Sequence, residues 1–86
     1  MTLEIHDRKV FDKGTRLIRQ GEKPWEAYLI HTGRVQIIRE RYGQKHVIAE
    51  LGPGDVCGEM ALLNNRNHHS TAVALEQTVT YVIDKV

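Results

Sequence analysis

The chain has 86 residues, with 41% hydrophobic and 27% charged side chains and a formal net charge of +1. This length allows one domain at most, the composition is that of a globular protein, and the balanced charge argues against a nucleic-acid-binding or membrane-surface protein. No apolar run approaches the roughly 20 residues of a membrane helix, and the N-terminal segment lacks the apolar core of a signal peptide. The single cysteine, Cys57, allows no internal disulfide, so we expect a cytoplasmic protein. The expected organisation is one domain over residues 1–86.

Short strands separated by turns account for most of the chain. Asp12-Lys13-Gly14 and Gln20-Gly21-Glu22-Lys23-Pro24 are turn signals that end the first two strands. The compact apolar run Ala27-Tyr28-Leu29-Ile30 is typical of a buried strand. In chain order, strands are expected over residues 9–11, 15–18, 25–31, 34–41, 45–51, 70–74 and 78–83, with a short apolar pair at 56–57.

The middle of the chain has the pattern of a hairpin that turns at residues 42–44. Alternation places Val35 and Ile37 on one face of its first strand. The same rule aligns three apolar side chains on one face of the return strand: Val47, Ala49 and Leu51. Because several short strands occur at near-even spacing with Gly at the turns, we expect a mainly β fold. The expected architecture is an antiparallel, jelly-roll-like β-roll of about eight strands with one short helix near residues 59–63.

Residues 52–74, GPGDVCGEMALLNNRNHHSTAVA, are the most informative stretch. A short strand stops at Gly58 and is followed by good helix formers, which exposes free backbone N–H groups at the start of a helix. Such N–H groups suit a phosphate. The carboxylate of Glu59, in the same first turn, can accept a hydrogen bond from a sugar hydroxyl. One motif therefore offers a phosphate site beside a ribose site.

This stretch resembles the phosphate-binding cassette of the cyclic nucleotide-binding domain, the family of the catabolite activator protein and the protein kinase A regulatory subunit. Gly58 to Leu62 match the cassette in order, and Ser70, Thr71, Val73 and Ala74 match its return strand. The resemblance covers roughly Phe11 to Ile83. Its other segments are Phe11-Asp12-Lys13-Gly14, Ile18-Arg19-Gln20-Gly21-Glu22, Ala27-Tyr28-Leu29-Ile30, Gly33-Arg34-Val35 and Leu51-Gly52-Pro53-Gly54-Asp55.

The resemblance also implies helices that flank the roll, one of which covers the ligand in family members. The 86 residues contain no clear counterpart of these helices, so we expect them to be absent or vestigial here. Two interpretations stay open: a piece truncated before its C-terminal lid helices, or a minimal roll that partner chains cover. Exposed apolar patches on so small a domain favour self-association in either case.

The resemblance assigns the ligand to residues of the cassette and its return strand. Gly58 permits close approach of a phosphate, and Glu59 accepts from the ribose 2′-OH. For most of the others a purely structural role, in packing or in strand propensity, is the competing interpretation. The predicted ligand-binding residues are Gly58, Glu59, Met60, Ala61, His68, His69, Ser70 and Thr71.

His68 occupies the position where the family has its phosphate-binding Arg. Arg grips two phosphate oxygens with a planar fork, whereas a neutral imidazole supplies one donor. Losing one hydrogen bond to a charged group weakens binding by roughly 10- to 100-fold. Arg66, two residues earlier, is an alternative cation if the loop shifts.

Metal binding and catalysis are not expected. His68 and His69 are neighbours on an extended segment and point to opposite faces, so they do not form a ligand pair. The His-x-His pattern of the cupin metal enzymes, which have a similar topology, is absent, and no nucleophile–base pair or carboxylate dyad is visible. We expect no cofactor and no enzymatic activity.

The leading hypothesis is a ligand-sensing regulatory module that binds a cyclic purine nucleotide, cyclic AMP or cyclic GMP, and acts on an attached effector domain or subunit. The alternative is a degenerate roll that binds no nucleotide and serves as a scaffold or oligomerisation module. The substitution of His68 for the family's Arg motivates the alternative. Nucleic-acid and membrane contacts are not expected from this domain, and a homo-oligomer remains possible.

Overall fold

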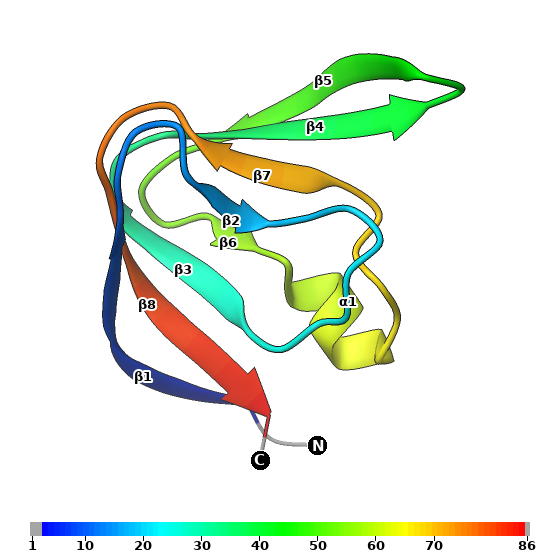
Figure 1. The fold of residues 1–86 in the computed structure, drawn as a ribbon. Helices are drawn as coiled ribbons and strands as arrows, with labels where there is room; N and C mark the ends of the chain where they lie inside the picture. The colour runs from blue at the N-terminus through cyan, green and yellow to red at the C-terminus, as the bar shows by residue number, and fades with distance from the viewer. Residues whose placement is uncertain (1–2, 86) are drawn as a thin grey trace.

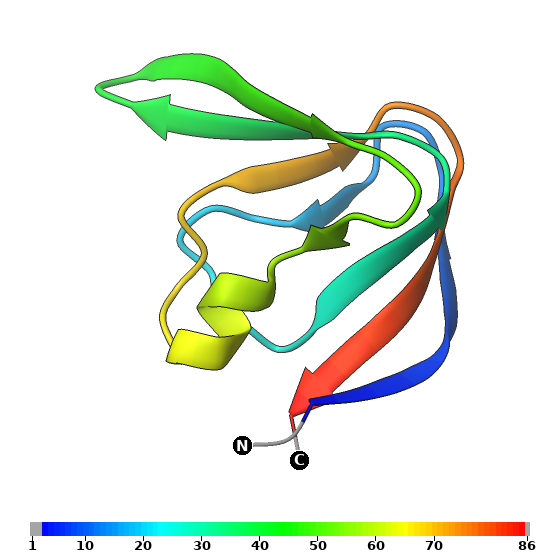
Figure 2. The same ribbon diagram turned by 180° about the vertical axis from the view of Figure 1, so that it is seen from behind.

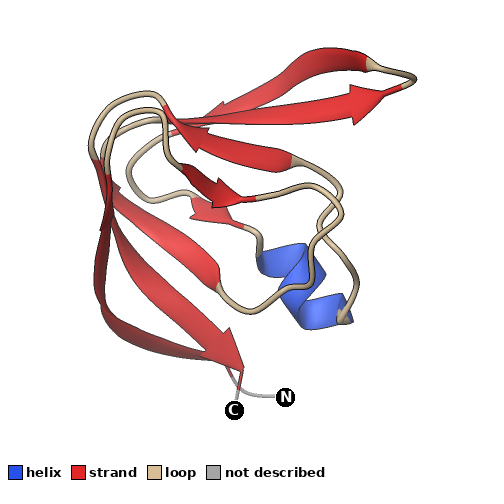
Figure 3. Cartoon of the chain, in the orientation of Figure 1, coloured by secondary structure: helices blue, strands red, loops and turns tan. Residues whose placement is uncertain are grey.

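The structure is a computed structural model that describes residues 3–85. These residues form two four-stranded antiparallel sheets and one short helix (Figures 1 and 3). The strands are β1 (Leu3–Phe11), β2 (Arg16–Ile18), β3 (Ala27–Thr32), β4 (Val35–Arg41), β5 (Gln44–Leu51), β6 (Val56–Cys57), β7 (Thr71–Ala74) and β8 (Thr78–Lys85), and the helix is α1 (Glu59–Asn64). The predicted mainly β roll with a single short helix is confirmed.

The strand order explains the roll. One sheet runs β1-β8-β3-β6 and the other runs β2-β7-β4-β5. Only β4 and β5 are consecutive in both chain and sheet, and they form a hairpin that extends past the other strands (Figure 1). All other pairings join segments that are distant in sequence, which is the connectivity of a jelly roll.

The first strand is longer than the sequence indicated. It begins at Leu3 rather than at residue 9 and pairs with β8 from Leu3↔Lys85 to Phe11↔Thr78. Residues Leu3 to Val10 are all exposed, so burial of apolar side chains does not hold them in place. Main-chain hydrogen bonds to β8 hold this segment as an edge strand, and a periodicity analysis does not detect such bonds.

The main core lies between the two sheets. Phe11 and Tyr28 meet edge to face with ring centroids 5.1 Å apart. Two threonines of β8, Thr78 and Thr80, are also fully buried, and their hydroxyls donate to the carbonyl oxygens of Glu76 and Lys9, each at 2.9 Å. The buried residues of this core are Phe11, Leu17, Ile18, Tyr28, Ile30, Val35, Cys57, Ala72 and Ala74.

A second, smaller core attaches α1 to the roll. Leu62 is 1% exposed and packs with Ala27 and Ile83, against which Leu29 and Val56 also lie. Because side chains alternate along a strand, Ala27 lies on the opposite face of β3 from Tyr28 of the main core. A helix of six residues is not stable alone, so this contact holds α1 in place.

The hairpin departs from the sequence analysis at one residue. Ile37 pairs with Ala49 and Ile38 pairs with Val47, which leaves Ile48 as an extra residue on β5. Ala49 therefore shares a face with Ile37, while Val47 shares the opposite face with Ile38. The expected alignment of Val47 with Ala49 and Leu51 is wrong because this bulge changes the alternation.

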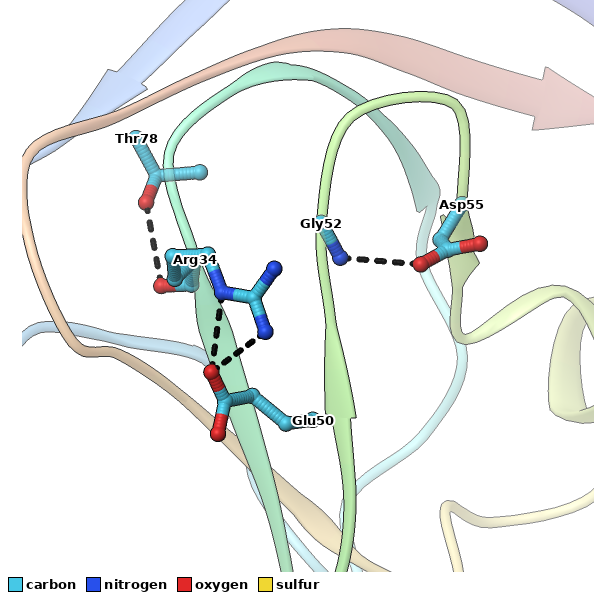
Figure 4. Close-up of polar contacts among 5 residues, drawn as sticks. All are labelled: Arg34, Glu50, Gly52, Asp55 and Thr78. Carbon is cyan, nitrogen blue, oxygen red and sulfur yellow. Dashed lines mark hydrogen bonds and ion pairs between the residues drawn. The ribbon is translucent and has the colours of Figure 1, made fainter.

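Polar contacts fix the turn that leads into β6 and α1 (Figure 4). The Asp55 carboxylate accepts the Gly52 N–H at 2.8 Å, and the Arg34 Nε donates to Glu50 at 2.8 Å. The Thr78 hydroxyl lies 3.4 Å from the Arg34 carbonyl oxygen. Seen from behind, the chain leaves this turn, passes through β6 and enters α1 directly (Figure 2). The turn thus sets where the cassette begins.

Candidate functional site

Gly58 joins β6 to α1 in a conformation that needs glycine. Its φ is 86°, in the left-handed region, and it is the N-cap of α1. A Cβ at this position would collide with the Ile18 side chain and would lie 3.3 Å from Cε1 of His68. Both the backbone angle and the packing therefore favour glycine at this position.

The first turn of α1 presents unused hydrogen-bond donors. The Leu62 N–H donates to the Gly58 carbonyl at 3.3 Å, but within residues 3–85 the N–H groups of Glu59, Met60 and Ala61 have no acceptor. Glu59 and Met60 are exposed. These donors are therefore open to a ligand or to water, as expected at a helix start.

An open hollow of about 700 Å³ lies beside this turn. All the predicted site residues except Thr71 line it, so the structure brings them together. We call it the outer hollow. It is lined by Val56, Gly58, Glu59, Met60, Ala61, Asn64, Arg66, Asn67, His68, His69 and Ser70.

A smaller, apolar space of about 190 Å³ continues from the outer hollow into the roll. We call it the inner recess. It shares Val56, Gly58, His68 and Ser70 with the outer hollow, and its remaining lining is Ile18, Ile37, Leu51, Cys57 and Ala72. A polar mouth over an apolar interior is typical of sites for small molecules.

Thr71 lies elsewhere. Its hydroxyl oxygen accepts the Gln20 N–H at 3.0 Å, and the residue lines a separate groove on the outer side of the sheet with Ile38 and Val73. Ala72 and Ala74 are the buried residues of β7, so alternation turns Thr71 outward. Ser70, one residue earlier, keeps its place in the hollow.

His68 lies at the junction of the outer hollow and the inner recess and is 8% exposed. Its N–H donates to the Glu22 carbonyl at 2.9 Å, and its carbonyl accepts the Gly21 N–H at 2.8 Å. Burial lowers the pKa of the His68 imidazole, and the charge of Glu22 acts in the opposite direction. The hollow therefore has a neutral imidazole at pH 7 at the position where the resemblance implies a permanent cation.

Arg66 and His69 are exposed at the mouth of the outer hollow. The Arg66 N–H donates to the Ala61 carbonyl at 3.1 Å, which folds the loop back onto α1 after Asn65 takes a left-handed conformation. Arg66 is predicted only as an alternative cation, and Asn64 and Asn67 are not among the predicted site residues. Nor is the lining of the recess, although the alternation along residues 34–41 marks the face on which Ile37 lies.

Within residues 3–85, the structure gives no indication of a reactive thiol, a metal site or a membrane-spanning helix. Burial raises the pKa of the Cys57 thiol to about 12, so this group stays protonated. No group of three or more His, Cys, Asp or Glu side chains in the described part of the chain is placed to hold a metal ion. The one described helix is too short to cross a membrane.

Sequence comparisons with known proteins identify the family of this chain. The sequence profile described as "Cyclic nucleotide-binding domain" matches residues 8–86. The cyclic AMP receptor protein of Thermus thermophilus is 34% identical over 79 residues, which are 91% of this chain and 37% of that protein.

Two solved structures extend the comparison. The cGMP-bound form of an EAL enzyme has a TM-score of 0.86 at 28% identity, covering 91% of this chain and 21% of that one. The regulatory subunit of a cAMP-independent protein kinase A from Trypanosoma brucei has a TM-score of 0.85 at 31% identity, covering 95% of this chain and 29% of that one. The present chain therefore spans well under half the length of these relatives.

Proposed function

This chain belongs to the cyclic nucleotide-binding domain family, and we propose that its outer hollow and inner recess bind a cyclic purine nucleotide, cyclic AMP or cyclic GMP. The observation that carries the proposal is that residues 59–61, whose N–H groups have no acceptor within residues 3–85, line the outer hollow, to which Glu59 brings a carboxylate. The names of two relatives, a cyclic AMP receptor protein and a cGMP-bound enzyme, support the same class of ligand.

The two spaces match the parts of such a ligand. The free N–H groups beside Gly58, together with His68, would contact the phosphate, and Glu59 would accept from the ribose 2′-OH. The apolar side chains of the inner recess, Ile37 and Leu51 among them, suit the face of a purine. A bound ligand would draw the cassette toward the roll. This movement would act as a switch only if the ligand binds the closed conformation of the cassette more tightly than the open one.

The domain would bind and regulate without chemistry of its own. The buried Cys57 thiol is protonated, and within residues 3–85 no side-chain hydrogen bond links Ser70 of the hollow to a His or Glu that could act as its base. Regulation would act in the cytoplasm, on an attached effector domain or on a separate subunit, and a second copy of the chain would be a further partner. The regulatory subunit among the similar structures supports this role.

A second candidate is a roll that binds no cyclic nucleotide and serves as a scaffold. It is favoured by the neutral, buried His68 at the family's Arg position. A relative described as cAMP-independent has the same roll, which supports this alternative.

Calorimetric titration of the chain with cyclic AMP and with cyclic GMP separates the two candidates. Saturable heat with either nucleotide, lost in Glu59→Ala and retained in Thr71→Ala, supports binding in the outer hollow. Glu59 lines this hollow whereas Thr71 lies on the other side of the sheet. An absence of heat at millimolar nucleotide would exclude the first candidate and leave the scaffold.

A further inference from the structure

The strand register of β4 places one more cation near the hollow. β4 pairs with β7 through Gln36↔Val73, Ile37↔Ala72 and Ile38↔Thr71. Ile37 and Ala72 line the inner recess, whereas Ile38 and Thr71 line the groove on the outer side of the sheet. Ile37 therefore marks the face of β4 that is turned to the recess, and Ile38 marks the face that is turned to the outer groove.

Continuing this register by one residue places Arg39 opposite Ser70. Opposite residues of antiparallel strands share a face, and Ser70 lines both the outer hollow and the inner recess. Glu40 and Lys45, the next cross-strand pair, line the outer groove, so the alternation holds through this region. Arg39 thus lies on the ligand side of the hairpin, next to His46 of β5.

β4 remains extended at this point although its pairing with β7 has ended. The Gln20 side chain replaces the missing strand: its Oε1 accepts the Glu40 N–H at 2.8 Å and its Nε2 donates to the Glu40 carbonyl at 3.0 Å. The backbone that bears Arg39 is therefore held on both edges, by Gln20 and by β5.

Arg39 has no ion pair or side-chain hydrogen bond within residues 3–85, and it is only partly exposed. Two arginines differ in this respect, since Arg34 pairs with Glu50 and Arg19 approaches Glu22 at 4.0 Å. A guanidinium on such a partly buried side chain gains from a neighbouring anion. The outer hollow, in turn, is lined by Glu59 and by one exposed arginine, Arg66.

We propose that Arg39 contacts the phosphate of a cyclic nucleotide bound in the outer hollow and supplies the cation that His68 does not. The guanidinium does not line the hollow as it stands, so the contact requires the side chain to turn past Ser70. This inference rests on the proposed function. It makes Arg39 a determinant of affinity for the charged part of the ligand.

The test is calorimetric titration of the chain with cyclic AMP at low and at moderate salt. Arg39→Gln should lower the affinity by roughly 10- to 100-fold and weaken its dependence on salt, because one ionic contact is lost. Lys45→Gln is the matched control: it removes a positive charge from the same hairpin, but on the outer face. Arg39→Lys keeps the positive charge but loses the paired donors of the planar guanidinium, so it should retain part of the affinity.

The outcomes separate this inference from the proposed function. If the wild-type chain binds cyclic AMP and Arg39→Gln binds equally well, the role of Arg39 is overturned and the proposed function stands. Equal losses in Arg39→Gln and Lys45→Gln also overturn it, since they indicate a general charge effect. If the wild-type chain binds neither cyclic AMP nor cyclic GMP, both proposals fail. A thermal melt of each variant confirms that the roll is folded.

Discussion

His68 and Glu22 connect the loop after α1 to the turn before β3. The His68 N–H donates to the Glu22 carbonyl at 2.9 Å, and the Gly21 N–H donates back to the His68 carbonyl at 2.8 Å. This exchange fixes the backbone at residue 68, while the imidazole lies beside Gly58. The position of the imidazole in the hollow is therefore set by main-chain bonds that a substitution at residue 68 would leave in place.

The stability of the chain should depend on pH through His68. Burial lowers the pKa of this group in the folded state, whereas the unfolded chain takes up a proton near pH ~6.5. Between these two values the unfolded state binds more protons, so stability is complete above about pH 6.5 and declines as the pH falls below it. Urea unfolding at pH 7.5 and 5.5 should show a loss at the lower pH that is reduced in His68→Gln. His69→Gln, at the exposed neighbour, should behave as the wild type, and an undiminished loss in His68→Gln would contradict this assignment.

Binding should respond to the same group. A bound phosphate favours the charged imidazole, so affinity for cyclic AMP should rise as the pH is lowered from about 7.5 to about 5.5. His68→Arg supplies a permanent cation, and it should raise affinity at pH 7.5 by roughly 10- to 100-fold and remove the pH dependence. Calorimetric titrations of both proteins across this range measure the effect. No gain in His68→Arg would mean that the loop does not present residue 68 to the ligand.

Gly58→Ala should destabilise the fold more than Gly54→Ala does. Both glycines have left-handed φ angles, 86° and 90°, so each substitution costs about 1–2 kcal/mol in backbone strain. A Cβ at residue 58 also collides with Ile18, whereas a Cβ at residue 54 meets no atom within 4 Å. The difference between the two free energies of unfolding isolates the packing contribution. Equal losses would show that Ile18 moves aside at no cost.

Glu59→Gln should reduce the preference for ribose over deoxyribose. The carboxylate lines the outer hollow and would accept from the 2′-OH, a hydrogen bond to a charged group. Affinity for cyclic AMP should fall by roughly 10-fold or more, while affinity for 2′-deoxy cyclic AMP should change little. Competition titrations with the two nucleotides give the ratio. The same loss for both would place the effect of Glu59 in helix formation instead.

Leu62→Ala should release α1 from the roll. Leu62 is 1% exposed and packs on Ala27 and Ile83, so truncation should cost about 2–5 kcal/mol of unfolding free energy. Leu63, next in the chain, is 38% exposed, so Leu63→Ala is a matched control with a much smaller expected effect. Chemical denaturation measures both. Comparable losses would indicate that α1 is held by its other contacts.

Much of the fold could be predicted because turns and apolar runs mark it locally. The helix was expected over residues 59–63 and is observed at Glu59–Asn64, since Gly58 precedes a run of helix formers. The N-terminal part of the first strand, residues 3–8, and the bulge at Ile48 were not predicted, because both depend on a partner strand. Main-chain pairing between Leu3 and Lys85 leaves no mark in either segment alone.

The candidate site was predictable to the same extent. Gly58 and His68 were located because the cassette is continuous in sequence, and the hollow brings them together. Thr71 was expected beside the ligand but lies on the outer face of β7, because side chains alternate along the strand and Ala72 takes the inner face. Ile18, Leu51 and Ala72 come from separate strands, so only the folded arrangement places them in one recess. Their role follows from topology, which local patterns do not encode.

The three residues Gln20, Gly21 and Glu22 contact the hairpin, the cassette loop and β7 at once, through Glu40, His68 and Thr71. Each contact uses a main-chain group or an amide of defined reach, so adding or deleting one residue here would break all of them together. A natural chain that builds the same hollow should therefore tolerate hardly any change in the length of this turn. Insertions in such chains belong instead at the tip of the hairpin, where Tyr42 is fully exposed.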